Sequence, residues 1–197
     1  MLSPKLFSVS ASTSLGRFHL VCSGLGLRGV CWPGEKASSS RLKPPFGPSA
    51  QGRGQASSLP ASNASAGTAK LLKTTAKQLA DYFDGKAVCF SRKLDLSGLS
   101  PFAQKVLREL AKVPYGETIS YGELAKRAGK PKAARAVGSV LAKNPLPIIV
   151  PCHRVLASDG SLGGYSAPGR LKLKRQLLLM EKETERIHHE DHEGHKG

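Results

Sequence analysis

The sequence predicts an α+β protein in which a small antiparallel sheet with one helix precedes a mostly helical part. Three observations lead to this class. Near the N-terminus, two apolar segments flank a glycine-containing turn, which is typical of a β-hairpin. Residues 69–83 carry apolar side chains at helical spacing. Residues 120–142 contain two short helical segments joined by a tight turn with Gly129, which indicates a helix-turn-helix.

Length and charge narrow the class of partner. The chain has 197 residues, which suits one large domain or two small ones. It carries 30 Lys and Arg against 14 Asp and Glu. This excess of positive charge indicates an acidic partner, most simply nucleic acid, with an anionic membrane surface as the alternative. No apolar run approaches the roughly 20 residues that a bilayer-spanning helix needs, so we expect no membrane span.

The first element has two interpretations. Residues 1–34 contain no acidic residue and several Ser, Lys and Arg, a composition that resembles an organellar transit peptide. Residues 15–22, however, partly alternate between apolar and polar, residues 23–26 form a turn, and residues 27–32 return as a second apolar segment. We therefore favour an N-terminal strand pair.

The rest of the first part is less regular. Residues 33–69 are rich in Pro, Gly and Ser, so we expect a flexible loop whose Lys and Arg add nonspecific affinity for DNA. A helix over residues 69–83 follows and ends at Asp84-Gly85, and residues 87–90 predict a short strand. This part contains no catalytic constellation, and we expect it to serve as structural support.

Capping patterns locate the helices of the second part. Ser100 followed by Pro101 is typical of a helix start. Ser120 and Glu123 fit a capping box at the start of the next helix. A further helix over residues 131–142 carries small side chains and one long cation: Ala133, Ala134, Arg135, Ala136 and Gly138. An ordinary packed helix with a solvated arginine is the alternative, but in a basic chain we prefer contact with DNA.

The segment from Ile148 to Val155, Ile-Ile-Val-Pro-Cys-His-Arg-Val, carries the candidate chemistry. Its β-branched residues favour extended backbone, so we interpret it as a buried extended segment that brings Cys152 into the interior. A thiol becomes a good nucleophile when a neighbouring imidazole takes its proton and a third group orients the ring. Successive side chains on a strand face opposite ways, so His153 reaches the thiol only if the chain bends. A buried, inert cysteine is the alternative.

This segment resembles the active-site signature of the methylated-DNA–protein-cysteine methyltransferases. The resemblance is close over residues 97–181 and weaker over residues 13–97. It implies a ribonuclease-H-like support domain over residues 1–97, with the loop at 33–69, and a winged-helix-like DNA-binding and alkyltransferase domain over residues 98–182. We expect residues 183–197 to form a disordered tail.

The resemblance also implies an activity. The protein would transfer a methyl or other alkyl group irreversibly from the 6-oxygen of guanine in DNA, and less well from the 4-oxygen of thymine, to Cys152. The base would first flip out through the minor groove. Each molecule would react once, because a thioether is a poor leaving group. No cofactor is implied, and the expected partner is double-stranded DNA containing alkylated guanine.

The resemblance assigns roles to particular residues. In catalysis, Cys152 is the nucleophile, His153 the base acting through a water, Glu181 the group that orients His153, and Asn144 the brace of the turn that holds Cys152. Around the flipped base, Tyr121 polarises a purine ring nitrogen, the carbonyls of Cys152 and Val155 accept from the exocyclic amine, Tyr165 walls the pocket, and the amide of Ser166 reaches the 6-oxygen. On DNA, Arg135 fills the space left by the base, Tyr121 rotates the 3′ phosphate, and Ala103, Gly122, Lys130 and Ser158 touch the backbone.

Some features leave alternatives. Glu183 and Glu185 compete with Glu181 for the orienting role, because all three follow the apolar run 177–180. Residues 167–170 lengthen the segment beside the pocket, which leaves open how bulky an adduct it accepts. Arg154 belongs to the signature, and we give it a structural role in bracing the site. Some relatives hold a structural zinc in the first part through Cys and His ligands. Cys22 lies one position away from the expected cysteine ligand, and no set of histidines completes the site, so we expect no metal.

Three other functions fit the sequence less well. A non-catalytic binder of alkylated DNA would have lost the nucleophile, whereas this chain retains Cys152 together with His153, Asn144 and Glu181. A helix-turn-helix transcription factor would need base-reading side chains on residues 131–142, where Ala and Gly predominate. A cysteine protease would leave the basic helix-turn-helix unexplained. We expect a monomer in the nucleus, with no membrane attachment, and regard the histidines at the C-terminus as a solvated tail.

Overall fold

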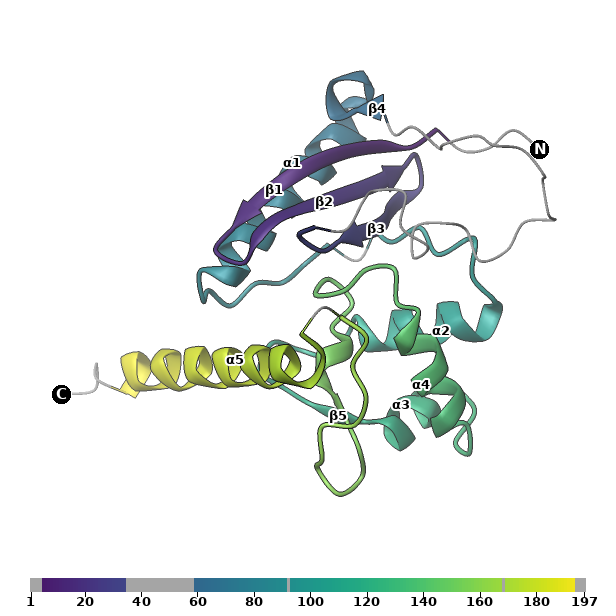
Figure 1. Cartoon of the computed structure of the whole chain (residues 1–197), viewed down its shortest axis with the longest axis vertical. Coiled ribbons are helices and arrows are strands. Elements are labelled where there is room, and N and C mark those ends of the chain that lie inside the picture. The colour runs from purple at the N-terminus through teal and green to yellow at the C-terminus, as the bar shows by residue number, and fades with distance from the viewer. Residues whose placement is uncertain (1–4, 35–58, 92, 168, 194–197) are drawn as a thin grey trace.

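The structure is a computed structural model that describes residues 5–34, 59–91, 93–167 and 169–193. A sheet and helix α1 form one part, and helices α2 to α5 form the other, with the two parts lying side by side (Figure 1). None of the helices in the described ranges is long and apolar enough to cross a membrane.

The sheet contains β1 (Phe7–Thr13), β2 (Gly16–Ser23), β3 (Gly26–Cys31) and β4 (Leu59–Pro60), in the order β3-β2-β1-β4. The first three strands are antiparallel neighbours, and β4 pairs parallel with β1. The predicted hairpin of β2 and β3 is confirmed. Strand β1 was not predicted, and its seven residues pair with β2 along their whole length. Residues 7–31 therefore contain three strands of the sheet, as the strand interpretation expected for residues 15–32.

Helix α1 (Ala66–Phe83) packs on this sheet and buries one face, including Leu72, Leu79 and Tyr82. Its N-cap is Ser65, whose hydroxyl accepts from the amide of Thr68. The prediction of a loop over residues 33–69 was therefore wrong at its C-terminal end. There, β4, the 3₁₀ turn η1 (Ala61–Asn63) and the first turn of α1 occupy residues 59–68. Residues 35–58 lie outside the described residues.

The predicted strand at residues 87–90 was also wrong, because these residues form no ladder. They run past the end of α1, where Gln78 Nε2 donates to the carbonyl of Cys89 at 2.8 Å. A side chain thus supplies the hydrogen bond that a neighbouring strand would have given.

The second part begins with α2 (Pro101–Leu110), capped by Ser100 as predicted. Strand β5 (Ile119–Ser120) leads into α3 (Tyr121–Arg127), where the hydroxyl of Ser120 accepts from the amide of Glu123 at 3.0 Å. This is one of the two hydrogen bonds of the predicted capping box. The Glu123 carboxylate, which would make the other, lies 3.4 Å from Arg127 Nε instead. Helix α4 (Ala134–Ala142) begins three residues after Pro131, where we had placed its start. The helix-turn-helix order is confirmed with this shorter second helix.

The segment before Cys152 is buried, but it is not extended. Residues 146–150 form turns, and Ile148 has φ 70°, which is uncommon for a β-branched residue. Cys152 begins a 3₁₀ turn, η2 (Cys152–Arg154), followed by β6 (Val155–Leu156), which pairs parallel with β5. Complete burial of Ile148 outweighs its preference for a strand. The chain therefore bends at Cys152, which is the condition we set for His153 to act.

Helix α5 (Arg170–Glu193) is the last element and extends away from the other helices (Figure 1). Glu181 lies within this helix, directly after the apolar run 177–180. The prediction of a disordered tail over residues 183–197 was wrong as far as Glu193, because the helix continues to that residue. Residues 194–197 lie outside the described residues.

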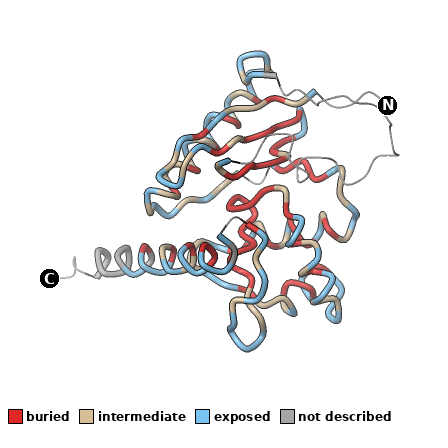
Figure 2. The backbone as a smooth tube through the Cα atoms, viewed as in Figure 1, coloured by how far each residue is buried: buried red, intermediate tan, exposed pale blue. Residues whose placement is uncertain are grey.

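Buried residues run along the strands and through the segment between α4 and α5 (Figure 2). The two parts join there through backbone and side-chain contacts. The amide of Val30 on β3 donates to the carbonyl of Pro145 at 2.8 Å. This contact holds the edge of the sheet against the turn that precedes Cys152.

Candidate active site

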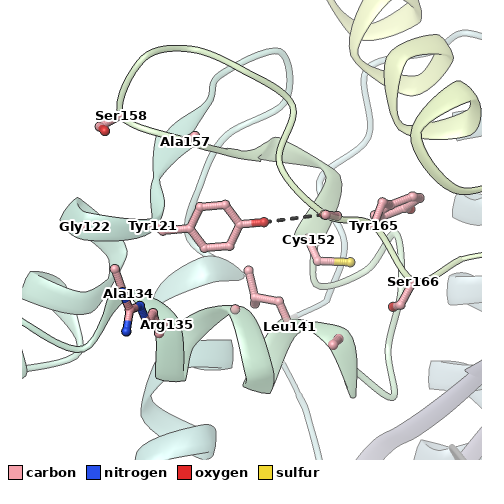
Figure 3. A pocket seen from close by; sticks show the side chains of 13 residues that line it. Tyr121, Gly122, Ala134, Arg135, Leu141, Cys152, Ala157, Ser158, Tyr165 and Ser166 are labelled. Carbon is pink, nitrogen blue, oxygen red and sulfur yellow. Dashed lines mark hydrogen bonds between the residues drawn. The ribbon is translucent and has the colours of Figure 1, made fainter.

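A cavity of about 700 Å³ lies beside Cys152 (Figure 3). Its walls come from the start of α3, from α4 and from the segment after β6, which lie far apart in sequence. The residues predicted for catalysis, base binding and DNA contact that line it are Cys152, Tyr121, Tyr165, Ser166, Gly122, Arg135 and Ser158. Cys152 is 7% exposed, so its thiol meets the cavity while the rest of the residue is buried. The structure thus gathers seven predicted residues in one place.

Tyr121, the first residue of α3, spans this cavity (Figure 3). Its hydroxyl donates to the carbonyl of Gly164 at 3.4 Å. Gly163 has φ 57°, and a Cβ added there would lie 3.1 Å from the Tyr121 ring, so the glycine lets the loop approach it. Burial raises the pKa of Tyr121, and the charge of Cys152 adds to the effect. The phenol is therefore a hydrogen-bond donor at neutral pH.

His153 and Glu181 are fully buried and do not line this cavity. His153 Nε2 is 2.8 Å from Glu181 Oε1. Because the Glu181 carboxylate accepts hydrogen bonds, Nε2 carries the proton. His153 Nδ1 is buried without a hydrogen-bond partner among the described residues. The ring therefore presents one donor to Glu181 and leaves its other nitrogen as an acceptor.

Five donors surround the Glu181 carboxylate: His153 Nε2, the hydroxyl of Tyr82 at 2.6 Å, Arg154 Nε at 2.9 Å, Arg154 Nη2 at 3.0 Å and the amide of Gly116 at 3.2 Å. Burial alone would raise the pKa of Glu181, but the hydrogen bonds from His153 and Arg154 and the charge of Arg154 outweigh it, so that this pKa is lowered to about 2. The carboxylate is thus a fixed anion beneath the imidazole.

His153 itself is neutral at neutral pH. Burial lowers its pKa, and the nearby positive charges of Arg154 and Lys174 act in the same direction, while Glu181 opposes them. A neutral imidazole with Nδ1 unprotonated is the form that accepts a proton. Burial and the fixed Glu181 therefore prepare His153 as a base.

Arg154 and Asn144 support this arrangement from two sides. The Arg154 guanidinium makes the paired bonds to Glu181 and donates through Nη1 to the carbonyl of Val113 at 2.7 Å. Asn144 is buried, donates through Nδ2 to the carbonyl of Val150 at 2.8 Å, and accepts from the amide of Leu146 at 3.0 Å. These contacts lie in the turn where we expected Asn144 to act.

Like His153, Glu181 and Asn144, three further predicted residues lie outside the cavity wall: Val155, Ala103 and Lys130. Val155 is fully buried, and its carbonyl accepts from Lys174 Nζ at 2.6 Å. The amide of Ala103, through which we expected DNA contact, donates to the capping hydroxyl of Ser100 at 3.3 Å. Lys130 is exposed, and its Nζ lies 5.3 Å from the centre of the Phe102 ring.

Two residues of the site were missed in the sequence. Lys174 is fully buried and donates to the carbonyls of Val155 and Leu162, which ties β6 to the loop before Tyr165. Burial lowers its pKa to about 8, although the nearby Cys152 charge opposes this. Its spacing of seven residues before Glu181 places both on one helical face, which could have revealed it. Tyr82 comes from the first part of the molecule. No helical spacing or motif around it in the sequence relates it to Glu181.

The other cysteines have different surroundings. Burial raises the pKa of Cys22 to about 12, which makes that thiol unreactive. Within the described ranges, no group of three or more His, Cys, Asp or Glu could hold a metal ion. The expectation that this protein binds no zinc stays a prediction.

Known proteins resemble this chain in sequence and in fold. Residues 101–183 match the sequence profile of the 6-O-methylguanine DNA methyltransferase DNA-binding domain. A methylated-DNA–protein-cysteine methyltransferase of Mycolicibacterium paratuberculosis is 49% identical over 106 residues, which are 54% of this chain and 62% of that protein. The matched region thus spans less than two thirds of the relative's length.

Solved structures resemble more of the chain. The O6-methylguanine methyltransferase of Mycobacterium tuberculosis superposes with a TM-score of 0.67 at 34% identity, covering 91% of this chain and 94% of that one. The structure of the M. tuberculosis OGT in complex with DNA gives a TM-score of 0.65 at 32% identity, with the same coverage. These similarities include both parts of the fold.

Proposed function

The chain belongs to the methylated-DNA–protein-cysteine methyltransferase family, and we propose that it repairs DNA by moving an alkyl group from the 6-oxygen of guanine to its own Cys152. The observation that carries this proposal is the position of Cys152. Its thiol meets the cavity, and the next residue in the chain is the buried base His153, whose Nε2 lies 2.8 Å from the anion Glu181. A nucleophile, a base and an orienting group are thus in the order that nucleophilic catalysis needs.

The reaction begins with loss of the Cys152 proton. His153 Nδ1 accepts it through a water, and Glu181 stabilises the imidazolium that results. The thiolate then attacks the alkyl carbon, so that an S–C bond forms while the C–O bond to guanine breaks. The electron pair of the broken bond stays on the guanine, which takes up one proton in place of the one that the thiol lost. The products are an S-alkyl cysteine and unmodified guanine.

The cavity would hold the flipped guanine. Tyr121, a donor at neutral pH, would stabilise the negative charge that develops on the purine. Tyr165 would wall the pocket, the amide of Ser166 would reach the 6-oxygen, and the carbonyl of Cys152 would accept from the exocyclic amine. The carbonyl of Val155, which accepts from Lys174 and lies outside the cavity wall, would have to turn toward the cavity to do the same. Nothing in this arrangement removes an alkyl group from sulfur, so each molecule would react once. The 4-oxygen of thymine would react less well.

DNA would approach over α3 and α4. Small residues on α4 let its backbone come close to a narrow minor groove, and the exposed Arg135 at the cavity would fill the space left by the flipped base. Gly122, Ser158, Lys130 and the region of Ala103 would contact phosphates. Backbone contact without base reading suits a lesion that occurs in any sequence.

The fold of each domain, the oligomeric state and the cellular location are also proposals. Three antiparallel strands with a fourth strand parallel to β1 support a ribonuclease-H-like first domain, divided from a winged-helix-like second domain near residue 97. We propose a monomer. Nuclear residence stays a prediction that rests on the substrate and the positive charge alone.

Transfer of a labelled methyl group from a duplex containing 6-O-methylguanine tests the proposal. We expect label on Cys152, located by mass spectrometry, to saturate at about one per molecule, and Cys152→Ala to take up none. A Cys22→Ala variant is the matched control, because that thiol is buried in the core. Binding to the lesion without any transfer would contradict the proposal and leave a damage-recognition protein.

A further inference from the structure

The network beneath Cys152 includes a side chain from the first part of the molecule. Tyr82 lies in the last turn of α1 and is fully buried. Its hydroxyl donates to Glu181 Oε1 at 2.6 Å and lies 3.3 Å from His153 Nε2. The sequence separates Tyr82 from these two residues by 99 and 71 positions. The first part therefore touches the catalytic pair directly.

Tyr82 and His153 donate to the same oxygen, and Arg154 Nη2 donates to it as well. Each donor withdraws part of the negative charge on Oε1. A strong bond from Tyr82 therefore weakens the attraction of this oxygen for the imidazole proton. Without the hydroxyl, Glu181 would stabilise the imidazolium more and His153 would become more basic.

The Tyr82 ring is held in place. It packs against Phe83 at 5.2 Å, Tyr115 at 5.9 Å and Phe90 at 6.0 Å between ring centres. Burial raises the pKa of Tyr82 well above its usual value, and the charge of Glu181 acts in the same direction. The phenol thus remains a donor over the whole physiological pH range.

We propose that Tyr82 is a positioning residue for the alkyl-transfer centre, through which the first part of the molecule fixes the Glu181 carboxylate and limits the basicity of His153. The inference rests on the proposed function, in which His153 receives the Cys152 proton. The other charged groups that act on His153 are Glu181 and Lys174 from α5 and Arg154 from η2. Tyr82 reaches it from α1, so the first part contributes more than the structural support that we expected.

Titration of the thiol in the full-length protein tests this proposal without DNA. Thiolate formation is followed by its ultraviolet absorbance, with the same protein carrying Cys152→Ala subtracted so that the other cysteines cancel. In Tyr82→Phe the ring packing stays and the hydroxyl is lost. We expect the midpoint of thiolate formation to fall by about 0.5 to 1 pH unit, because a more basic His153 favours the thiolate–imidazolium pair.

Tyr115→Phe is the matched control. Its hydroxyl bonds to Thr184 at 3.3 Å in the same aromatic cluster. We expect its midpoint to stay where it is in the unmodified protein. An unchanged or higher midpoint in Tyr82→Phe, or an equal shift in both variants, would overturn the proposal.

A second substitution covers the case in which Tyr82→Phe fails to fold. Fluorotyrosine placed at position 82 alone keeps the ring and the hydroxyl, and its phenol is a stronger donor. We expect the midpoint to rise, opposite to the effect of phenylalanine, and a fall would overturn the proposal. Because these titrations use no DNA, their failure is distinct from a failure of the methyl-transfer experiment.

Discussion

The buried network next to Cys152, here the inner side, and the cavity that Cys152 lines, the outer side, are built in opposite ways. On the inner side, His153 and Glu181 are completely buried, and five donors surround the Glu181 carboxylate. On the outer side, Tyr121 makes one long hydrogen bond, and Arg135 and Ser166 are exposed. The inner side holds charge in a fixed geometry, whereas the outer side leaves surface for a ligand. We therefore expect inner substitutions to affect stability and chemistry together, and outer substitutions to affect mainly DNA and base binding.

Removal of the Glu181 charge should have the largest effect. Glu181→Gln leaves the buried Arg154 guanidinium without its counter-charge, so we expect a loss of about 3 to 5 kcal/mol in the free energy of unfolding and loss of methyl transfer. Denaturant unfolding and single-turnover transfer measure the two effects. Glu123→Gln, whose carboxylate makes exposed ion pairs on α3, should cost less than about 1 kcal/mol. Equal losses in both variants would contradict the distinction between the two sides.

Acid should weaken the same network. The folded pKa of Glu181 is about 2, below its ordinary value of 4.5, so the folded state binds fewer protons than the unfolded state between these values. Its contribution, on the order of 3 kcal/mol, is complete above about pH 4.5 and is lost as the pH falls toward 2. Unfolding measured at steps across this range should show the loss in the unmodified protein and a much smaller one in Glu181→Gln. An identical acid dependence in both proteins would contradict the assignment.

A substitution on the outer side should have an intermediate effect. Gly163→Ala combines a left-handed backbone with a Cβ 3.1 Å from the Tyr121 ring. We expect a loss of stability of about 1 to 2 kcal/mol together with weaker lesion binding, because Tyr121 must shift. Gly160→Ala shares the positive φ but has no atom within 4 Å of the added Cβ, so it reports backbone strain alone. Lesion-binding titrations should separate the two, and equal affinities would show that the cavity does not depend on this contact.

The smallest effect on stability should come from Arg135. It is exposed on α4 at the cavity, so Arg135→Ala should change the free energy of unfolding by less than about 0.5 kcal/mol. Affinity for lesion-containing duplex should nevertheless fall, by more than it falls in Lys73→Ala, an exposed cation on α1. Fluorescence anisotropy at fixed salt measures both. Equal losses would assign the affinity to net charge and not to α4.

Much of the fold could be predicted because its patterns are local. The caps at Ser100 and Ser120 and the β2–β3 hairpin follow from residues a few positions apart. Errors arose where distant contacts overrode local preference. Ile148 and its neighbours favour a strand, yet complete burial places them in turns. Residues 183–193 are mostly polar and resembled a tail, yet they continue α5, where the hydroxyl of Thr184 donates to the distant carbonyl of Gly85 at 2.9 Å.

The chemical groups of this protein can be read from its residues alone: a Pro-Cys-His-Arg segment, a basic helix-turn-helix and the residues that the family resemblance marks. How these groups are held follows from contacts between distant residues. Tyr82 from α1 donates to Glu181, and the buried Lys174 donates to the carbonyl of Val155. Such hydrogen bonds join residues that no local pattern relates. Their strength comes from burial, which exists only once the two parts have packed together.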